Sequence, residues 1–213
     1  MSAEVARIKG LLVDFEEEQL LEAVSQCLVA GDDPMAIVES CRDGMEEVGR
    51  RFAAGDYFVN ELIMSADLFG SVMKILGPSL ADGADSGPKT KVVIGTVKGD
   101  VHDIGKDIVV AMLRCNGFEV YDLGVNIPAQ QFVDKVRETG AKVVGLSGLL
   151  TLAFDGMAET VKALKDAGLD AKVMIGGGMT NEMVRAMVGA DACGHDAVEA
   201  VRLAKSFSEV VAK

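Results

Sequence analysis

Residues 91–117 read KVVIGTVKGDVHDIGKDIVVAMLRCNG, and this stretch decides the fold. It begins with valine, isoleucine and threonine, a composition typical of a buried strand, and it ends with apolar residues at helical spacing. The polar heptapeptide GDVHDIG, residues 99–105, lies between the two parts. A strand that leads through a short loop into a helix is the repeating unit of an α/β sheet. We therefore predict that GDVHDIG is a loop at the carboxyl end of a strand.

The same alternation continues to the end of the chain. Helical segments follow at residues 105–116, 128–139, 154–167, 180–188 and from 196 onward, and they separate short strands at residues 91–97, 118–123, 142–147, 172–177 and 191–193. Apolar, valine-rich strands joined by helices indicate a parallel sheet covered on both faces. We predict a doubly wound, Rossmann-type α/β domain of five strands in flavodoxin-like order, whose ligands bind beyond the carboxyl ends of the strands.

Residues 1–80 have a different period. Their apolar residues recur every three or four positions, for example at Val38, Cys41, Met45, Val48 and Phe52. This spacing is typical of helices that bury one face. We predict a four-helix bundle over residues 1–80, a linker at 81–90 (ADGADSGPKT), and the α/β domain at 91–213.

Helix-ending residues support the predicted bundle. Gly31 follows one apolar helical segment, and Asp33 with Pro34 supplies a cap and a first-turn proline for the next. Gly77 and Pro78 are expected to end the last helix.

Composition excludes several classes of function. Asp and Glu total 33 against 21 Lys and Arg, so the formal net charge is −12. Without a basic stripe, neither nucleic acid nor an anionic membrane is an expected partner. No apolar run approaches the length of a membrane span, and we expect a cytoplasmic protein. The four cysteines form no C-x-x-C pair and are interpreted as buried thiols.

Three polar or glycine-rich segments follow predicted strands. They are GDVHDIG, then SGLLT from Ser147 to Thr151, and GGGMT from Gly176 to Thr180. The fold would bring all three to one edge of the sheet.

Three alternative functions for that edge lack their motifs. Nucleotide binding would need G-x-G-x-x-G or a Walker lysine turn, and neither follows the first strand. A phosphorylated receiver domain would need an aspartate at the end of the third strand, where Ser147 stands. A Ser-His-Asp hydrolase would need G-x-S-x-G, whereas the sequence around Ser147 is GLSGL.

His102 remains the chemically distinctive residue. A lone histidine is more often structural, but Asp100 lies two residues before it and can accept a hydrogen bond from one ring nitrogen. That bond would leave the other nitrogen available to a metal. No further ligand cluster accompanies His102, so the sequence points to a metal held in a macrocycle that needs one axial donor.

The combined motifs resemble the cobalamin-binding domains of methionine synthase, corrinoid methyl carriers and coenzyme-linked mutases. The match consists of D-x-H-x-x-G at Asp100, His102 and Gly105, S-x-L at Ser147 and Leu149, and G-G at Gly176 and Gly177. Residues 48–69, VGRRFAAGDYFVNELIMSADLF, also resemble the helical cap of methionine synthase and the methyl carriers, which the mutases lack.

The resemblance implies a set of site residues. Cobalamin would bind with its own base withdrawn, His102 would be the lower axial ligand of cobalt, and Asp100 with His102 would tune that ligation. Ser147 and Thr151 would offer hydroxyls to the buried base or to the loop of His102. Ala153 replaces a serine of the methionine synthase relay, and His195 is not expected to be a ligand. The implied cofactor-binding residues are Gly99, Asp100, Val101, His102, Asp103, Ile104, Gly105, Ser147, Leu149, Thr151, Gly176, Gly177, Gly178 and Met179.

Phe58 and Met64 of the cap would shield the methyl face of the corrin, or else belong simply to the core of the bundle.

The resemblance also implies a function. The protein would be a cobalamin-binding corrinoid subunit of an anaerobic methyltransferase system in one-carbon metabolism, with catalysis proper left to its partners.

Those partners would be a donor-side methyltransferase, an acceptor-side methyltransferase and a reductive activase. The donor would be a methoxylated aromatic (an O-demethylase system, which we favour), methanol or a methylamine, and the acceptor tetrahydrofolate or a thiol coenzyme. The alternatives are cobalamin storage or delivery, and a cobalamin-dependent regulator.

Overall fold

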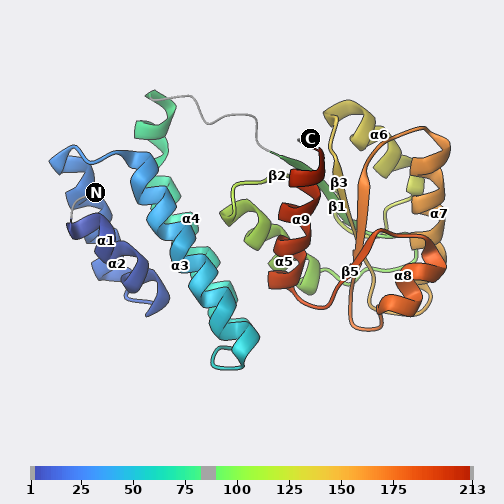
Figure 1. Cartoon of the computed structure of the whole chain (residues 1–213), viewed down its shortest axis with the longest axis horizontal. Helices are drawn as coiled ribbons and strands as arrows, with labels where there is room; N and C mark the ends of the chain where they lie inside the picture. The colour runs from blue at the N-terminus through green and yellow to red at the C-terminus, as the bar shows by residue number, and fades with distance from the viewer. Residues whose placement is uncertain (1–2, 83–89, 212–213) are drawn as a thin grey trace. The chain divides into compact units, whose positions relative to one another are not determined.

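A computed structural model describes residues 3–82 and 90–211 (Figure 1). The chain divides into two compact units, Met1–Gly87 and Pro88–Lys213. We call them the helical unit and the α/β unit. Within the described residues, no helix is both long and apolar enough to cross a membrane.

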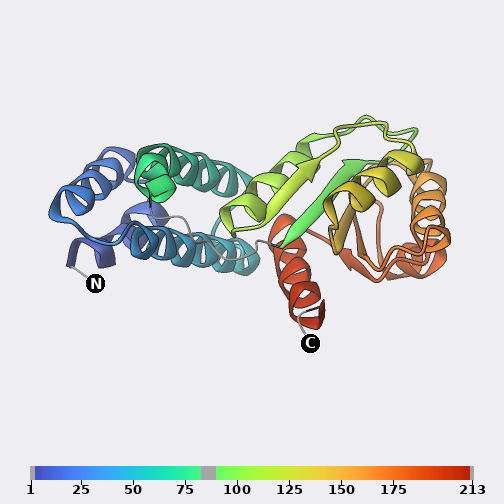
Figure 2. The same ribbon diagram turned by 90° about the horizontal axis from the view of Figure 1, so that it is seen from above.

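The helical unit is a bundle of four helices in its described part, as the sequence predicts. Its helices are α1 (Ala3–Val13), α2 (Glu17–Ala30), α3 (Pro34–Ala54) and α4 (Val59–Asp82). Figure 2 shows α3 and α4 side by side along the bundle. The helices bury a shared apolar core that includes Val5, Ile8, Leu12, Leu20, Val24, Ile37, Cys41, Met45, Leu62, Val72 and Leu76.

The predicted caps are present. Asp33 accepts a hydrogen bond from the backbone N–H of Met35, and Pro34 occupies the first turn of α3. Gly31 ends α2 with φ 81°, a left-handed conformation that glycine adopts without steric cost. These features explain why the sequence predicted the α2–α3 boundary.

The predicted end of α4 at Gly77 and Pro78 is wrong, because the helix continues to Asp82. Proline lacks the N–H that would donate to the preceding turn, but the residues after it can still continue the helix. Most of the predicted linker, residues 83–89, lies outside the described residues.

One end of the bundle is fastened by Tyr57. Its hydroxyl donates to the carbonyl of Val13 over 3.0 Å and accepts from Arg51 over 2.7 Å. The Tyr57 ring also lies 5.6 Å from that of Phe15. These contacts join the α1–α2 turn to the turn in which α4 begins.

The α/β unit contains a five-stranded parallel sheet in the order β2-β1-β3-β4-β5, which confirms the flavodoxin-like prediction. The strands are β1 (Lys91–Thr96), β2 (Glu119–Asp122), β3 (Val143–Ser147), β4 (Lys172–Gly176) and β5 (Ala192–Gly194). The helices are α5 (Ile104–Cys115), α6 (Ala129–Thr139), α7 (Ala153–Asp166), α8 (Glu182–Val188) and α9 (Ala197–Val211).

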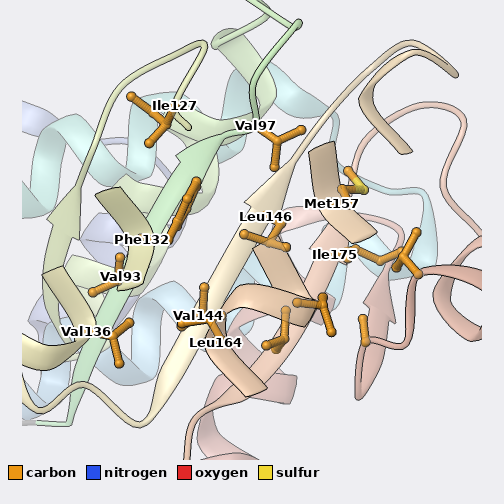
Figure 3. Close-up of a cluster of buried hydrophobic side chains, with 14 of the residues drawn as sticks. Val93, Val97, Ile127, Phe132, Val136, Val144, Leu146, Met157, Leu164 and Ile175 are labelled. Carbon is orange, nitrogen blue, oxygen red and sulfur yellow. The ribbon is translucent and has the colours of Figure 1, made fainter. Parts of the chain in front are cut away.

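Helices cover both faces of this sheet. Helices α6, α7 and α8 lie over one face, and α5 and α9 lie over the other (Figure 1). Figure 3 shows the core of the first face, where strand residues such as Val93, Val144 and Ile175 meet Phe132 and Met157 of the helices. All four cysteines are buried, as predicted.

Strand register brings the carboxyl ends of four strands to one edge. Thr96 of β1 pairs with Ser147 of β3, Ser147 with Gly176 of β4, and Gly176 with Gly194 of β5. We call this edge, with the loops that follow its strands, the rim. The three segments that sequence analysis selected therefore lie at the rim.

Candidate functional site

His102 lies in the loop between β1 and α5. Its ring Nδ1 is 2.6 Å from Oδ1 of Asp100, and its backbone N–H donates to the same oxygen over 2.9 Å. The Asp100 side chain is fully buried, whereas that of His102 is 48% exposed. With the Nδ1 proton directed at Asp100, Nε2 carries the lone pair that a metal would use.

Asp100 also binds the loop that follows β3. Its second oxygen, Oδ2, accepts the backbone N–H groups of Leu149 over 2.7 Å and Leu150 over 3.2 Å. Burial by itself would raise the pKa of Asp100, but the hydrogen bonds from His102, Leu150 and Leu149 outweigh it and lower the pKa to about 2. Asp100 is therefore an ionised acceptor that joins two loops of the rim.

Two positioning contacts were missed by sequence analysis. The buried hydroxyl of Thr96, the last residue of β1, donates to the carbonyl of His102 over 2.9 Å. Asn126, in the loop between β2 and α6, accepts the N–H of Gly99 at its Oδ1 over 2.9 Å. A polar residue at a strand end was the available signal for Thr96, whereas nothing in the local sequence marked Asn126.

Ser147 lies at the rim, but it contacts the start of the loop that carries His102 through its backbone and not through the hydroxyl that sequence analysis considered. Its backbone carbonyl accepts the N–H of Val97 over 3.0 Å. The hydroxyl that contacts the His102 loop belongs instead to Thr96. Thr151 is exposed, and Ala153 is fully buried. Since Oδ2 of Asp100 binds two backbone N–H groups, no serine at position 153 is needed to satisfy it.

The rim glycines divide into two kinds. A Cβ on Gly177, whose φ is 138°, would lie 2.0 Å from the carbonyl oxygen of Gly148, and one on Gly178 would lie 2.8 Å from Leu149 Cδ1. Packing between the loops after β3 and β4 therefore requires glycine at position 177, whereas a side chain at position 178 would only displace the tip of the exposed Leu149 side chain. A Cβ on Gly105 would meet no atom within 4 Å, so the space beside it is open to a ligand.

Exposed apolar side chains lie on the same rim loops as this polar centre. Val101 and Ile104 are 66% and 75% exposed, and Met179 is 54% exposed. Leu149 and Leu150, which lie in the SGLLT segment, and Leu152, which sequence analysis missed, are exposed on the loop after β3. An apolar rim around one half-exposed imidazole suits a large, flat and largely apolar ligand.

Asp103 does not share the arrangement of Asp100. It is exposed, precedes α5, and makes no side-chain cap to that helix.

Lys106, which sequence analysis overlooked, is buried and pairs with Asp122 of β2 over 2.7 Å and with Asp107 over 2.5 Å. The ion pair with Asp122 fastens the first turn of α5 to the end of β2.

Phe58 and Met64 belong to the helical unit and are exposed by 70% and 47%. The backbone N–H of Phe58 donates to Oε2 of Glu61 over 2.7 Å, which fixes the start of α4. Their exposure excludes the alternative that they are core residues of the bundle. Their role over a corrin ring stays a prediction.

The donor set suits a metal that brings its own ligands. Among the described residues, no group of three His, Cys, Asp or Glu side chains could hold a bare metal ion. His195 is exposed and only its backbone N–H is engaged, with Glu199 over 3.0 Å. One oriented imidazole in an apolar, open rim fits a metal carried in a macrocycle.

Comparison with known families gives two matches. A model described as "B12 binding domain" matches residues 90–202, and a second model with the same description matches residues 5–76. The chain is 36% identical to the trimethylamine corrinoid protein of Methanosarcina barkeri, over 97% of both chains. It is 37% identical to dimethylamine corrinoid protein 3 of Methanosarcina acetivorans, over 95% of this chain and 99% of that protein.

Two solved structures that are similar to this chain are also proteins that bind cobalamin or belong to a cobalamin methyltransferase complex. A cobalamin-binding protein from Desulfitobacterium hafniense matches with a TM-score of 0.82 and 38% identity, over 95% of this chain and 98% of that one. A chain of the methanol:cobalamin methyltransferase complex of Methanosarcina barkeri matches with a TM-score of 0.81 and 28% identity, over 97% and 80% of the two chains.

Proposed function

This chain belongs to the family of corrinoid proteins with B12-binding domains, and from that membership we propose that it carries methyl groups between two methyltransferases. The observation that carries the proposal is the buried Asp100 carboxylate, which binds Nδ1 of His102 and leaves Nε2 on a half-exposed ring. A bound corrinoid supplies a cobalt atom that can accept a methyl group and release it.

The chain's own residues hold and orient that group. We propose that Nε2 of His102 would hold the cobalt of that group, with Asp100 fixing the plane and the tautomer of the His102 ring. Gly105 leaves room at the start of α5, and the exposed apolar residues of the rim contact the cofactor. Phe58 and Met64 would exclude water from the bound cofactor, and Ser147 with Thr151 would bind it through their hydroxyls.

The partners define the methyl donor. The relatives named above are corrinoid proteins for trimethylamine and dimethylamine, and they favour a methylamine as the donor here. Methanol and the methoxylated aromatics that sequence analysis favoured are the competing donors, and tetrahydrofolate and a thiol coenzyme are the proposed acceptors. A donor-side methyltransferase, an acceptor-side methyltransferase and a reductive activase complete the proposed system.

Electron paramagnetic resonance of the Co(II) form tests the ligand assignment. The protein is reconstituted anaerobically with cobalamin, with and without nitrogen-15 histidine. Because the chain has two histidines, the same pair of spectra is recorded for His195→Gln, in which only His102 can respond. A label-dependent change in the axial hyperfine pattern, retained in His195→Gln, supports the proposal. A pattern that reports the cofactor's own base refutes it.

A further inference from the structure

Asn126 contacts the His102 loop through two groups of its own. Its side-chain Oδ1 accepts the N–H of Gly99, and its backbone N–H donates to the carbonyl of Asp100, each over 2.9 Å. The segment around Asn126 also pairs with the end of β1, because Ile127 forms a parallel bridge with Val97. The loop after β2 is therefore attached to the loop that carries His102.

The backbone of Asn126 has an unusual conformation. Its φ is 56°, and in the described residues only Phe15 shares a positive φ among residues other than glycine. Most residues with a Cβ avoid this left-handed region, but asparagine tolerates it better than most because its short polar side chain can hydrogen-bond locally. The conformation lets the backbone N–H and the side-chain oxygen of Asn126 bind the same loop.

These contacts fix the position of the Asp100 backbone, and further hydrogen bonds fix its side chain. Its carbonyl is held by Asn126, while its carboxylate is held by His102, Leu149 and Leu150. The preceding Gly99 has φ 89°, and if its N–H were released the Gly99–Asp100 peptide would still be restrained by a longer hydrogen bond, 3.2 Å from the N–H of Asp100 to the carbonyl of Val97. A turn of the Gly99–Asp100 peptide would move the carboxylate that orients the imidazole.

We propose that Asn126 is a positioning residue for the imidazole of His102 and acts through Gly99 and Asp100. The inference rests on the proposed role of His102 as a cobalt ligand. Asn126 is exposed, so replacing it removes contacts without opening a cavity in the core. Its effect on the site can thus be separated from an effect on folding.

Two substitutions isolate the side-chain oxygen. Asn126→Gly keeps the left-handed backbone and the backbone N–H but removes Oδ1. Asn126→Asp keeps an acceptor at the same place and also tolerates the conformation. Asp33→Ala is a matched control, because it removes a side-chain hydrogen bond of 3.0 Å to the N–H of Met35 in the helical unit.

Three measurements are made on the full chain. In the cofactor-free protein, hydrogen exchange of the Gly99 amide is followed by nitrogen-15 NMR. In the reconstituted protein, the dissociation constant of cobalamin and the fraction of Co(II) with a histidine nitrogen signal are determined. For Asn126→Gly we expect faster Gly99 exchange, a dissociation constant raised about threefold to tenfold, and a smaller histidine-ligated fraction. Asn126→Asp and Asp33→Ala should match the wild type in all three.

The outcomes separate this inference from the proposed function. If the wild type shows no histidine-ligated Co(II), the ligand assignment of His102 fails. If the wild type shows it and Asn126→Gly retains both its affinity and its signal, Asn126 is not a positioning residue. Loss of the signal in Asn126→Asp overturns the inference as well, whatever the glycine variant does, because that variant keeps both hydrogen bonds.

Discussion

Asp100→Asn is the substitution that tests the rim most directly. The carboxylate accepts four contacts, two at each oxygen: the backbone N–H and ring Nδ1 of His102 at Oδ1, and the N–H groups of Leu149 and Leu150 at Oδ2. An asparagine has one acceptor oxygen and one NH₂ group. Whichever way the amide turns, its NH₂ group must face N–H donors that the carboxylate had satisfied.

The expected loss of stability follows from those contacts. A hydrogen bond to a charged group contributes about 1.5 to 3 kcal/mol, and two of the four would be lost. The pKa of Asp100, lowered to about 2, indicates that these contacts, net of the opposing effect of burial, favour the ionised form by about 2 kcal/mol more in the folded protein than in the unfolded chain. We therefore expect the free energy of unfolding of the α/β unit to fall by about 3 kcal/mol.

The assay uses the cofactor-free full chain at neutral pH. Urea denaturation followed by circular dichroism measures the loss, and hydrogen exchange read by mass spectrometry locates it in the α/β unit. Asp103→Asn is the matched control, since it removes the same charge from an exposed side chain that makes no cap to α5. If the two variants differ by less than about 0.5 kcal/mol, the idea that Asp100 joins the two loops is wrong.

Three further substitutions have distinct expected results in urea denaturation. Gly177→Ala should destabilise the cofactor-free protein by about 2 kcal/mol or more, because its Cβ would collide with the Gly148 carbonyl. Gly105→Ala should not destabilise it but should weaken cobalamin binding in an equilibrium titration, and unchanged affinity would show that the open space is not used. Lys106→Met should cost about 1 to 3 kcal/mol relative to the exposed control Lys98→Met. Burial would lower the pKa of Lys106, but the hydrogen bonds and charges of Asp107 and Asp122 outweigh that effect, so the pKa is raised. The stabilisation is thus fully present below the ordinary lysine pKa and is lost as pH rises above it, so a cost of Lys106→Met that does not shrink at high pH would contradict the argument.

The fold was predictable because its signals are local. Valine-rich strands alternate with helical segments, and that alternation already implied a parallel sheet of flavodoxin-like order. The contact between Asp100 and His102 was predictable for the same reason, since two residues of one short loop supply it. Pro78 shows the limit of such signals, because a proline near the end of a helix does not always stop it.

The long-range contacts of the site were not predictable from the sequence. Asp100 binds backbone N–H groups 49 and 50 residues away, and a backbone group carries no mark in the sequence. The left-handed conformation of Asn126 and the burial of Lys106 likewise follow from the packed structure. Residue types predicted which groups would lie at the site, whereas tertiary packing determined its geometry.

The attachment of Asp100 to several loops has a consequence for protein engineering. Grafting the heptapeptide GDVHDIG onto another flavodoxin-like scaffold would transfer the imidazole and the carboxylate but not their orientation. The recipient would also need the backbone N–H groups of Leu149 and Leu150, the hydroxyl of Thr96 and the turn at Asn126. A transplanted ligand site must therefore include the ends of three neighbouring strands together, and a designer should treat those loops as one exchangeable part.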